Sequence, residues 1–142
     1  MFFFIINIIA LYVPKRLNKM DIYATSFFAF TYGLLTDTIL DLNYNLYGYF
    51  NEGFDWLGLT AIIMYFPAIS FLFLNFYPFN KRAGQKVLYI LLWSGFSISF
   101  EWLSLQTGFF YYNGWQLWYS AILYPAIFTS LIMNLKLINS FK

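Results

Sequence analysis

The sequence predicts an all-α integral membrane protein, a helical bundle with five transmembrane helices. Of its 142 residues, 61% are hydrophobic and only 10% are charged, whereas roughly 25% are charged in soluble domains. Apolar runs near the length of a transmembrane helix, about 20 residues, recur along the chain. The basic residues gather between alternate runs. A soluble domain of this size could not keep so many apolar side chains away from water.

Four apolar runs are long enough to cross a bilayer. They extend from about Ile22 to Leu40, Trp56 to Tyr77, Val87 to Leu105 and Leu117 to Ile138. Asp21 precedes the first of these runs, and we expect it to cap that helix at its N-terminus. Pro78 ends the second run, because proline cannot continue a helix.

The opening run, Phe2 to Val13, is shorter and ends at Pro14. A helix of this length rises only about 20 Å. It crosses the bilayer if Lys15, Arg16 and Lys19 extend toward the surface and the bilayer thins locally. We expect a short span here, with a re-entrant or interfacial segment as the alternative.

The distribution of basic residues predicts the orientation. Lys15, Arg16 and Lys19 form one group; Lys81, Arg82 and Lys86 form another; and Lys136 and Lys142 end the chain. An up-and-down path brings all three groups to one side of the membrane, which the positive-inside rule makes cytoplasmic. The loops around residues 42–54 and 106–116 contain no lysine or arginine. We therefore expect a multi-pass protein of the cell membrane, with its N-terminus outside and its C-terminus in the cytoplasm.

The composition also excludes several kinds of chemistry. The chain has no cysteine and no histidine, which removes thiolate nucleophiles, disulfides and the commonest transition-metal ligands. No polar stretch is long enough for an appended soluble domain, so residues 1–142 form a single transmembrane helical domain. The scattered net charge of +2 does not predict nucleic-acid binding. We expect no cofactor, with a bound cation such as calcium as the one open possibility.

Three acidic residues fall inside predicted helices or at their ends. Asp37 and Asp41 are four residues apart and share a helix face. Asp37 lies about 22 Å from the cytoplasmic end of its helix, and Glu101 about 21 Å from that end of another. Each acid also belongs to a polar stripe, so we expect the two helices to face a common centre. Ionisable groups inside a membrane are expensive and by default suggest function.

No basic side chain reaches that depth. The carboxylates must therefore be protonated, accept hydrogen bonds or be neutralised by a cation. Three interpretations stay open: a structural polar network, a functional site for a cation, proton or polar headgroup, and, for Asp41 in particular, contact with bulk water.

Aromatic and amide residues follow these acids in the sequence. Tyr112, Asn113 and Tyr119 are the candidate hydrogen-bonding neighbours of Asp37, Asp41 and Glu101. The segment 106–115 forms either an ordinary interfacial loop, the interpretation we favour, or an aromatic lid over the carboxylates that suits an ammonium group. Trp56, Trp115 and Trp118 are interpreted as an interfacial aromatic belt.

The segment 41–52 also suggests a metal site. Asp41, Asn43, Asn45 and Glu52 occupy the first, third, fifth and twelfth positions of an EF-hand-like loop. Leu46 occupies the sixth position, where the motif requires glycine, and the flanking helices do not fit. The hypothesis is a looser site for calcium or another hard cation, and the alternative is a polar loop at a helix end.

Several motifs extend over residues 20–130. They are Asp37-x-x-x-Asp41, Leu46-Tyr47-Gly48-Tyr49-Phe50, Asp55-Trp56, Tyr65-x-Pro67, Glu101-Trp102, Phe109-Phe110-Tyr111-Tyr112-Asn113-Gly114-Trp115 and Trp118-Tyr119-Ser120-Ala121. With them the chain resembles a family of small uncharacterised multi-spanning membrane proteins of Gram-positive, spore-forming bacteria. The resemblance implies a bacterial membrane location and supplies no catalytic residue.

A looser similarity connects the chain to the small intramembrane cyclases and hydratases of carotenoid synthesis. It rests on Glu101-Trp102, Gly108 and Pro125. The Pro-x-Glu-Glu element typical of the cyclases is absent, because Ala126, Ile127 and Phe128 follow Pro125. Isoprenoid chemistry is therefore not the leading expectation.

The leading hypothesis is a non-enzymatic binding or accessory protein. Its site, on the outer side, would take a cation, a lipid headgroup or a partner. The alternatives are an ion or proton pathway in a homo-oligomer, and an intramembrane isoprenoid- or lipid-modifying enzyme with Glu101 as general acid. The partners we expect are membrane lipids and either a second copy of the chain or another membrane protein.

Overall fold

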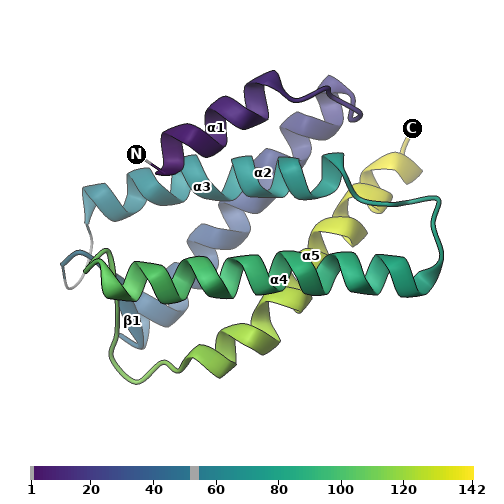
Figure 1. Ribbon diagram of the computed structural model, residues 1–142. Helices are drawn as coiled ribbons and strands as arrows, with labels where there is room; N and C mark the ends of the chain where they lie inside the picture. The colour runs from purple at the N-terminus through teal and green to yellow at the C-terminus, as the bar shows by residue number, and fades with distance from the viewer. Residues whose placement is uncertain (1, 52–54) are drawn as a thin grey trace.

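Five helices run alternately up and down in the computed structural model, which describes residues 2–51 and 55–142 (Figure 1). They are α1 (Phe2–Tyr12), α2 (Lys19–Asp37), α3 (Trp56–Asn75), α4 (Ala83–Gln106) and α5 (Leu117–Ser140). The prediction of five helices is therefore confirmed. Of these, α3, α4 and α5 are long and apolar enough to cross a membrane, and α1 is a shorter apolar helix.

Two helices begin earlier than expected. Asn18, not Asp21, caps α2, because its side-chain Oδ1 accepts a hydrogen bond of 2.8 Å from the backbone N–H of Asp21. The prediction that Asp21 is the cap is therefore wrong. Asp21 is instead buried and pairs with the ammonium group of Lys142 at 2.5 Å, which ties the end of the chain to α2. α4 starts at Ala83, whereas the apolar run begins only at Val87. The first turn of this helix is polar, so the apolar pattern did not include it.

The second helix also ends differently. After Asp37 the backbone widens into a π-helical turn, η1 (Thr38–Asn43), in which the N–H of Tyr44 donates to the carbonyl oxygen of Ile39 at 3.1 Å. The sequence predicted a regular α-helix to Leu40. π-Turns inside helices are rare and frequently occur at functional sites.

Two short strands depart from the predicted all-α fold. β1 (Tyr47–Tyr49) pairs antiparallel with β2 (Phe110–Tyr112), with Gly48 opposite Tyr111. The backbone N–H groups of Asn113 and Trp115 extend the pairing to the carbonyl oxygen of Leu46, at 2.8 and 3.0 Å. A Cβ at position 48 would overlap the Tyr111 side chain, which explains the glycine there. We call residues 47–49 and 110–112 the aromatic lid.

The lid lies at one end of the bundle, and the basic residues at the other. α1 and α2 pack on α3, and α5 packs on α2, α3 and α4. Figure 1 shows the N-terminus at the lid end and the C-terminus at the opposite, basic end. Toward the basic end the core is closely packed around Phe73 and Phe128, whose ring centroids are 4.5 Å apart. Near the lid the helices instead leave room for a cavity.

Candidate functional site

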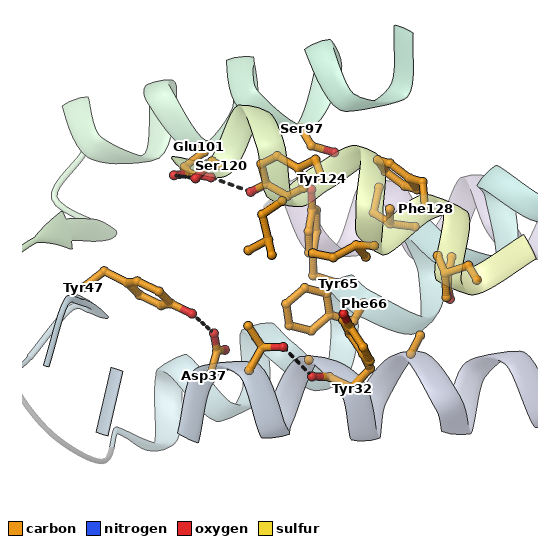
Figure 2. A pocket seen from close by; sticks show the side chains of 18 of the residues that line it. Tyr32, Asp37, Tyr47, Tyr65, Phe66, Ser97, Glu101, Ser120, Tyr124 and Phe128 are labelled. Atoms are coloured by element: carbon orange, nitrogen blue, oxygen red, sulfur yellow. Dashed lines mark hydrogen bonds between the residues drawn. The ribbon is translucent and has the colours of Figure 1, made fainter. Parts of the chain in front are cut away.

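A cavity of about 110 Å³ lies beneath the aromatic lid, between α2 and α4. Asp37 lines it from α2 and Glu101 from α4, and Figure 2 shows these acids on opposite walls; Tyr65 and Phe66 from α3 also line it. This arrangement agrees with the expectation that the two helices face a common centre. We call this space the central cavity.

Two tyrosines of β1 hold Asp37. The Tyr47 hydroxyl donates to Oδ1 at 2.6 Å, and the Tyr49 hydroxyl donates to Oδ2 at 3.1 Å. Residues two apart in a strand point to the same face, so a single extended segment delivers both donors. Asp37 and Tyr47 are both buried. Because of these two hydrogen bonds, each carboxylate oxygen of Asp37 has a partner inside the protein.

Glu101 is held by three hydroxyl groups. Ser120 donates to Oε1 at 2.6 Å, Tyr124 donates to Oε2 at 2.5 Å, and Tyr112 of the lid also donates to Oε1. The indole N–H of Trp115 in turn donates to the Ser120 hydroxyl oxygen at 2.9 Å. Trp115 therefore uses its polar atom inside the site, and the interpretation of this residue as part of an interfacial belt stays a prediction. Trp56 and Trp118 are exposed.

The lid tyrosines keep their protons. Burial, together with the nearby Asp37 carboxylate, raises the pKa of Tyr47 and Tyr49 well above the ordinary value. Burial and the hydrogen bond to Glu101 also raise the pKa of Tyr112. These hydroxyls act as donors at physiological pH, and hydrogen bonds donated to a carboxylate favour its charged form.

The central cavity contains no matching positive charge. None of the described residues that line it is lysine or arginine. The eight basic residues of the chain all lie in the segments 15–19, 81–86 and 136–142, toward the basic end. Two hydrogen-bonded carboxylates thus face one space whose described lining has no cationic side chain.

Asp41 does not join Asp37 and Glu101 in the central cavity. It lies in η1, is buried, and lines a separate space with Asp37 and Asp55. The π-helical turn begins between Asp37 and Asp41, so the regular helical spacing assumed for the pair does not hold. Of the three predicted acids, the structure brings Asp37 and Glu101 together and places Asp41 apart from Glu101.

Two other predicted residues lie beside the central cavity. The Asn113 side chain donates to the carbonyl oxygen of Asn45 at 3.0 Å and connects the two loops of the lid end. Tyr119 packs against Trp115 and Trp118, with ring centroids 5.2 and 4.2 Å apart. Neither residue lines the central cavity, whereas the predicted Tyr112 bonds Glu101 directly.

The EF-hand-like segment is only partly described. Asp41 is buried, the side chains of Asn43 and Asn45 are exposed, and Glu52 lies outside the described residues. Asn45 adopts a left-handed backbone with φ of 50°, as in a turn. The calcium site proposed for these four residues stays a prediction.

Sequence reasoning missed most of the hydrogen-bond donors. Tyr47, Tyr49, Ser120 and Tyr124 were not among the candidates. A signal for two of them was present, because Ser120 and Tyr124 are four residues apart and lie on one helix face, as a pair directed at one acid must.

Together the fold and the site define a small helical bundle with an acidic cavity closed by an aromatic lid. No family model, curated protein or solved structure matches this chain.

Proposed function

We propose that this chain is a binding protein of the cell membrane that takes a small cationic group, an ammonium, into the central cavity. The observation that carries the proposal is the pairing of Asp37 and Glu101 across one cavity whose described lining includes no basic side chain. A bound ammonium is attracted by both carboxylates and balances one of their two negative charges. Uncompensated charge in a low-dielectric site is costly, so a cationic ligand gains much of its affinity here.

The walls of the cavity suit the same ligand. Tyr65, Phe66 and Trp115 contribute aromatic rings to the lining. The face of an aromatic ring attracts an ammonium group by about 0.5–2 kcal/mol, the larger values applying when the pair is desolvated. Carboxylates and aromatic rings together favour an alkylated ammonium over a strongly hydrated metal ion.

The size of the cavity limits the ligand to a small head group. About 110 Å³ is less than the roughly 150 Å³ cavity that holds benzene. A neighbouring space of about 70 Å³ shares Glu101, Tyr65 and Phe66 with the central cavity and reaches Phe3 and Phe100. An apolar substituent on the ammonium would extend into this second space.

The hydrogen bonds at Glu101 favour binding over acid catalysis. A general acid must hold a proton until it reacts. Glu101 instead accepts hydrogen bonds from Tyr112, Ser120 and Tyr124, which occupy both of its oxygens and leave neither directed at a substrate. This geometry supports the binding protein over the intramembrane enzyme.

The charge distribution supports entry of the ligand from outside the cell. The basic groups gather at the end opposite the lid, and basic residues mark the cytoplasmic side of membrane proteins. In the proposed orientation the N-terminus and the lid lie outside and the C-terminus lies in the cytoplasm. The lid then closes the cavity toward the outer surface.

The test is calorimetric titration of the full chain in detergent micelles with methylammonium, which is smaller than benzene. The matched control ligand is methanol, an uncharged compound of similar size. We expect measurable heat and saturable binding for the cation, and an affinity at least about tenfold lower for the neutral compound. Equal affinity for the two compounds, or no binding of the cation, would contradict the proposal.

A further inference from the structure

A second acidic space lies beside the central cavity. It has a volume of about 160 Å³, and three aspartates line it: Asp37 at the end of α2, Asp41 in η1 and Asp55 at the start of α3. Asp37 and Tyr49 line both spaces and form part of the wall between them. We call this second space the aspartate pocket.

Asp41 is the unusual residue of the aspartate pocket. Its side chain is 6% exposed, and its Oδ1 is buried without a hydrogen-bond partner in the described part of the chain. Asp37 differs, because both of its oxygens accept hydrogen bonds from lid tyrosines. Leaving a buried charged oxygen unpaired is energetically unfavourable, so Asp41 requires a compensating partner.

Asp55 presents a second unpaired oxygen. Its Oδ1 caps α3 by accepting a hydrogen bond of 3.1 Å from the backbone N–H of Leu57. Its Oδ2 is buried and, within residues 2–51 and 55–142, has no hydrogen-bond partner. Two separate elements thus each present one free carboxylate oxygen at the pocket.

The described lining of the pocket contains no basic side chain to balance this charge. Three kinds of partner could satisfy such oxygens: protons, ordered waters or a cation. Water alone satisfies hydrogen bonding but leaves the charges of Asp41 and Asp55, and that of neighbouring Asp37, unbalanced. Protonation removes a charge but adds a buried hydroxyl that itself needs an acceptor, whereas a cation satisfies both requirements.

We propose that Asp41 and Asp55 bind a hard divalent cation of the calcium class in the aspartate pocket. Carboxylate oxygens are the ligands that such ions prefer. No group of three or more acidic side chains among the described residues is placed to enclose a metal. The ion therefore keeps part of its water shell, for which about 160 Å³ leaves room. Calcium accepts such irregular coordination more readily than magnesium, which requires near-octahedral geometry.

This site is distinct from the proposed ammonium site. It uses the free oxygens of Asp41 and Asp55, neither of which lines the central cavity. It also differs from the calcium site predicted for the loop, which uses Asn43 and Asn45, whose side chains are exposed. In the aspartate pocket the second carboxylate comes from Asp55, at the start of α3.

The experiment measures calcium binding to the full chain after treatment with a chelator. Calorimetry and the melting temperature are followed during titration with calcium chloride, then with magnesium chloride. We expect calcium to bind and to raise the melting temperature, with a smaller effect of magnesium. Asp41→Asn and Asp55→Asn each lower calcium affinity by about tenfold or more, because affinity follows the number of charged ligands. Asn43→Ala serves as the control and leaves the affinity unchanged.

A second measurement separates the site from a loss of folding. Asp41→Asn removes an unpaired buried charge, so without calcium this variant melts at a higher temperature than the unsubstituted protein. Asparagine at position 55 still caps α3, so that helix is retained. Absence of any calcium effect, as expected if water alone fills the pocket, or a calcium affinity in both aspartate variants equal to that of the unsubstituted protein, overturns the proposal. Glu101→Gln retains the calcium response, so failure of the ammonium site and failure of the calcium site give different results.

Discussion

The Tyr124 hydroxyl donates a hydrogen bond of 2.5 Å to Glu101 and so joins α5 to α4 inside the bundle. Ser120, one turn earlier on α5, donates to the same carboxylate at 2.6 Å. The lid adds a third donor through Tyr112. A single acid therefore fixes the position of α5 and one strand of the lid, and its removal should affect both.

Tyr124→Phe removes one of these donors and keeps the ring. We expect the free energy of unfolding to fall by about 1.5–3 kcal/mol, because the bond is made to a charged group. Denaturant unfolding in detergent micelles measures the change. Tyr23→Phe, at an exposed position of α2, is the control and should stay within about 0.5 kcal/mol of the unsubstituted protein. Equal effects of the two substitutions would show that the hydrogen bond to Glu101 does not stabilise the fold.

The lid tyrosines predict a loss of stability at alkaline pH. Burial and the Asp37 charge raise the pKa of Tyr47 and Tyr49 in the folded protein, whereas the unfolded chain releases these protons near pH 10. The stability they contribute is complete below about pH 10 and is lost as the pH rises above it. We expect the melting temperature to fall less steeply above pH 10 in the double variant Tyr47→Phe, Tyr49→Phe. Identical slopes would contradict this linkage.

Gly33 sets the shape of the central cavity. A Cβ at this position of α2 would overlap the ring of Phe66 on α3. We expect Gly33→Ala to lower stability by about 1–3 kcal/mol and to weaken ammonium binding, because the displaced ring enters the cavity. Adding Phe66→Leu should restore part of the stability.

The control for this prediction is Gly95→Ala on α4. A Cβ there meets no atom within 4 Å, so the substitution should leave stability unchanged or raise it by less than about 1 kcal/mol. If Gly33→Ala behaves like Gly95→Ala, the close approach of α2 to Phe66 is not required.

Thiol labelling tests the proposed orientation, because the chain has no cysteine of its own. Tyr44→Cys places an exposed thiol at the lid end, and Gln85→Cys places one at the basic end. A membrane-impermeant maleimide added to intact cells should label position 44, and position 85 only after lysis. The reverse pattern would invert the topology.

The helices could be predicted from the sequence because their signals are local. Long apolar runs interrupted by basic segments indicate each helix without knowledge of its neighbours. The helix ends were less predictable. Asn18 rather than Asp21 caps α2, and the π-helical turn after Asp37 leaves no mark in the apolar pattern.

The site could be predicted only in part, because its decisive contacts join distant segments. Intramembrane acids indicated Asp37 and Glu101 as candidates. The lid brings Tyr47 and Tyr112 together from loops far apart in the sequence, and strands of three residues are too short to show alternation. Asp55 was not predicted as a site residue, because an aspartate at the start of a helix is accounted for as an N-cap. Only the structure shows that its second oxygen is buried without a partner among the described residues.

The most direct test of the central claim is the affinity for methylammonium of Asp37→Asn and Glu101→Gln, measured by calorimetry beside the unsubstituted protein. Each substitution removes one negative charge and nearly preserves the side-chain shape. If the cation lies between the two carboxylates, each variant binds it about tenfold or more weakly. Asp21→Asn, which removes a negative charge at the basic end, should leave the affinity unchanged. Unchanged affinity in both cavity variants, or an equal loss in all three, would contradict the account.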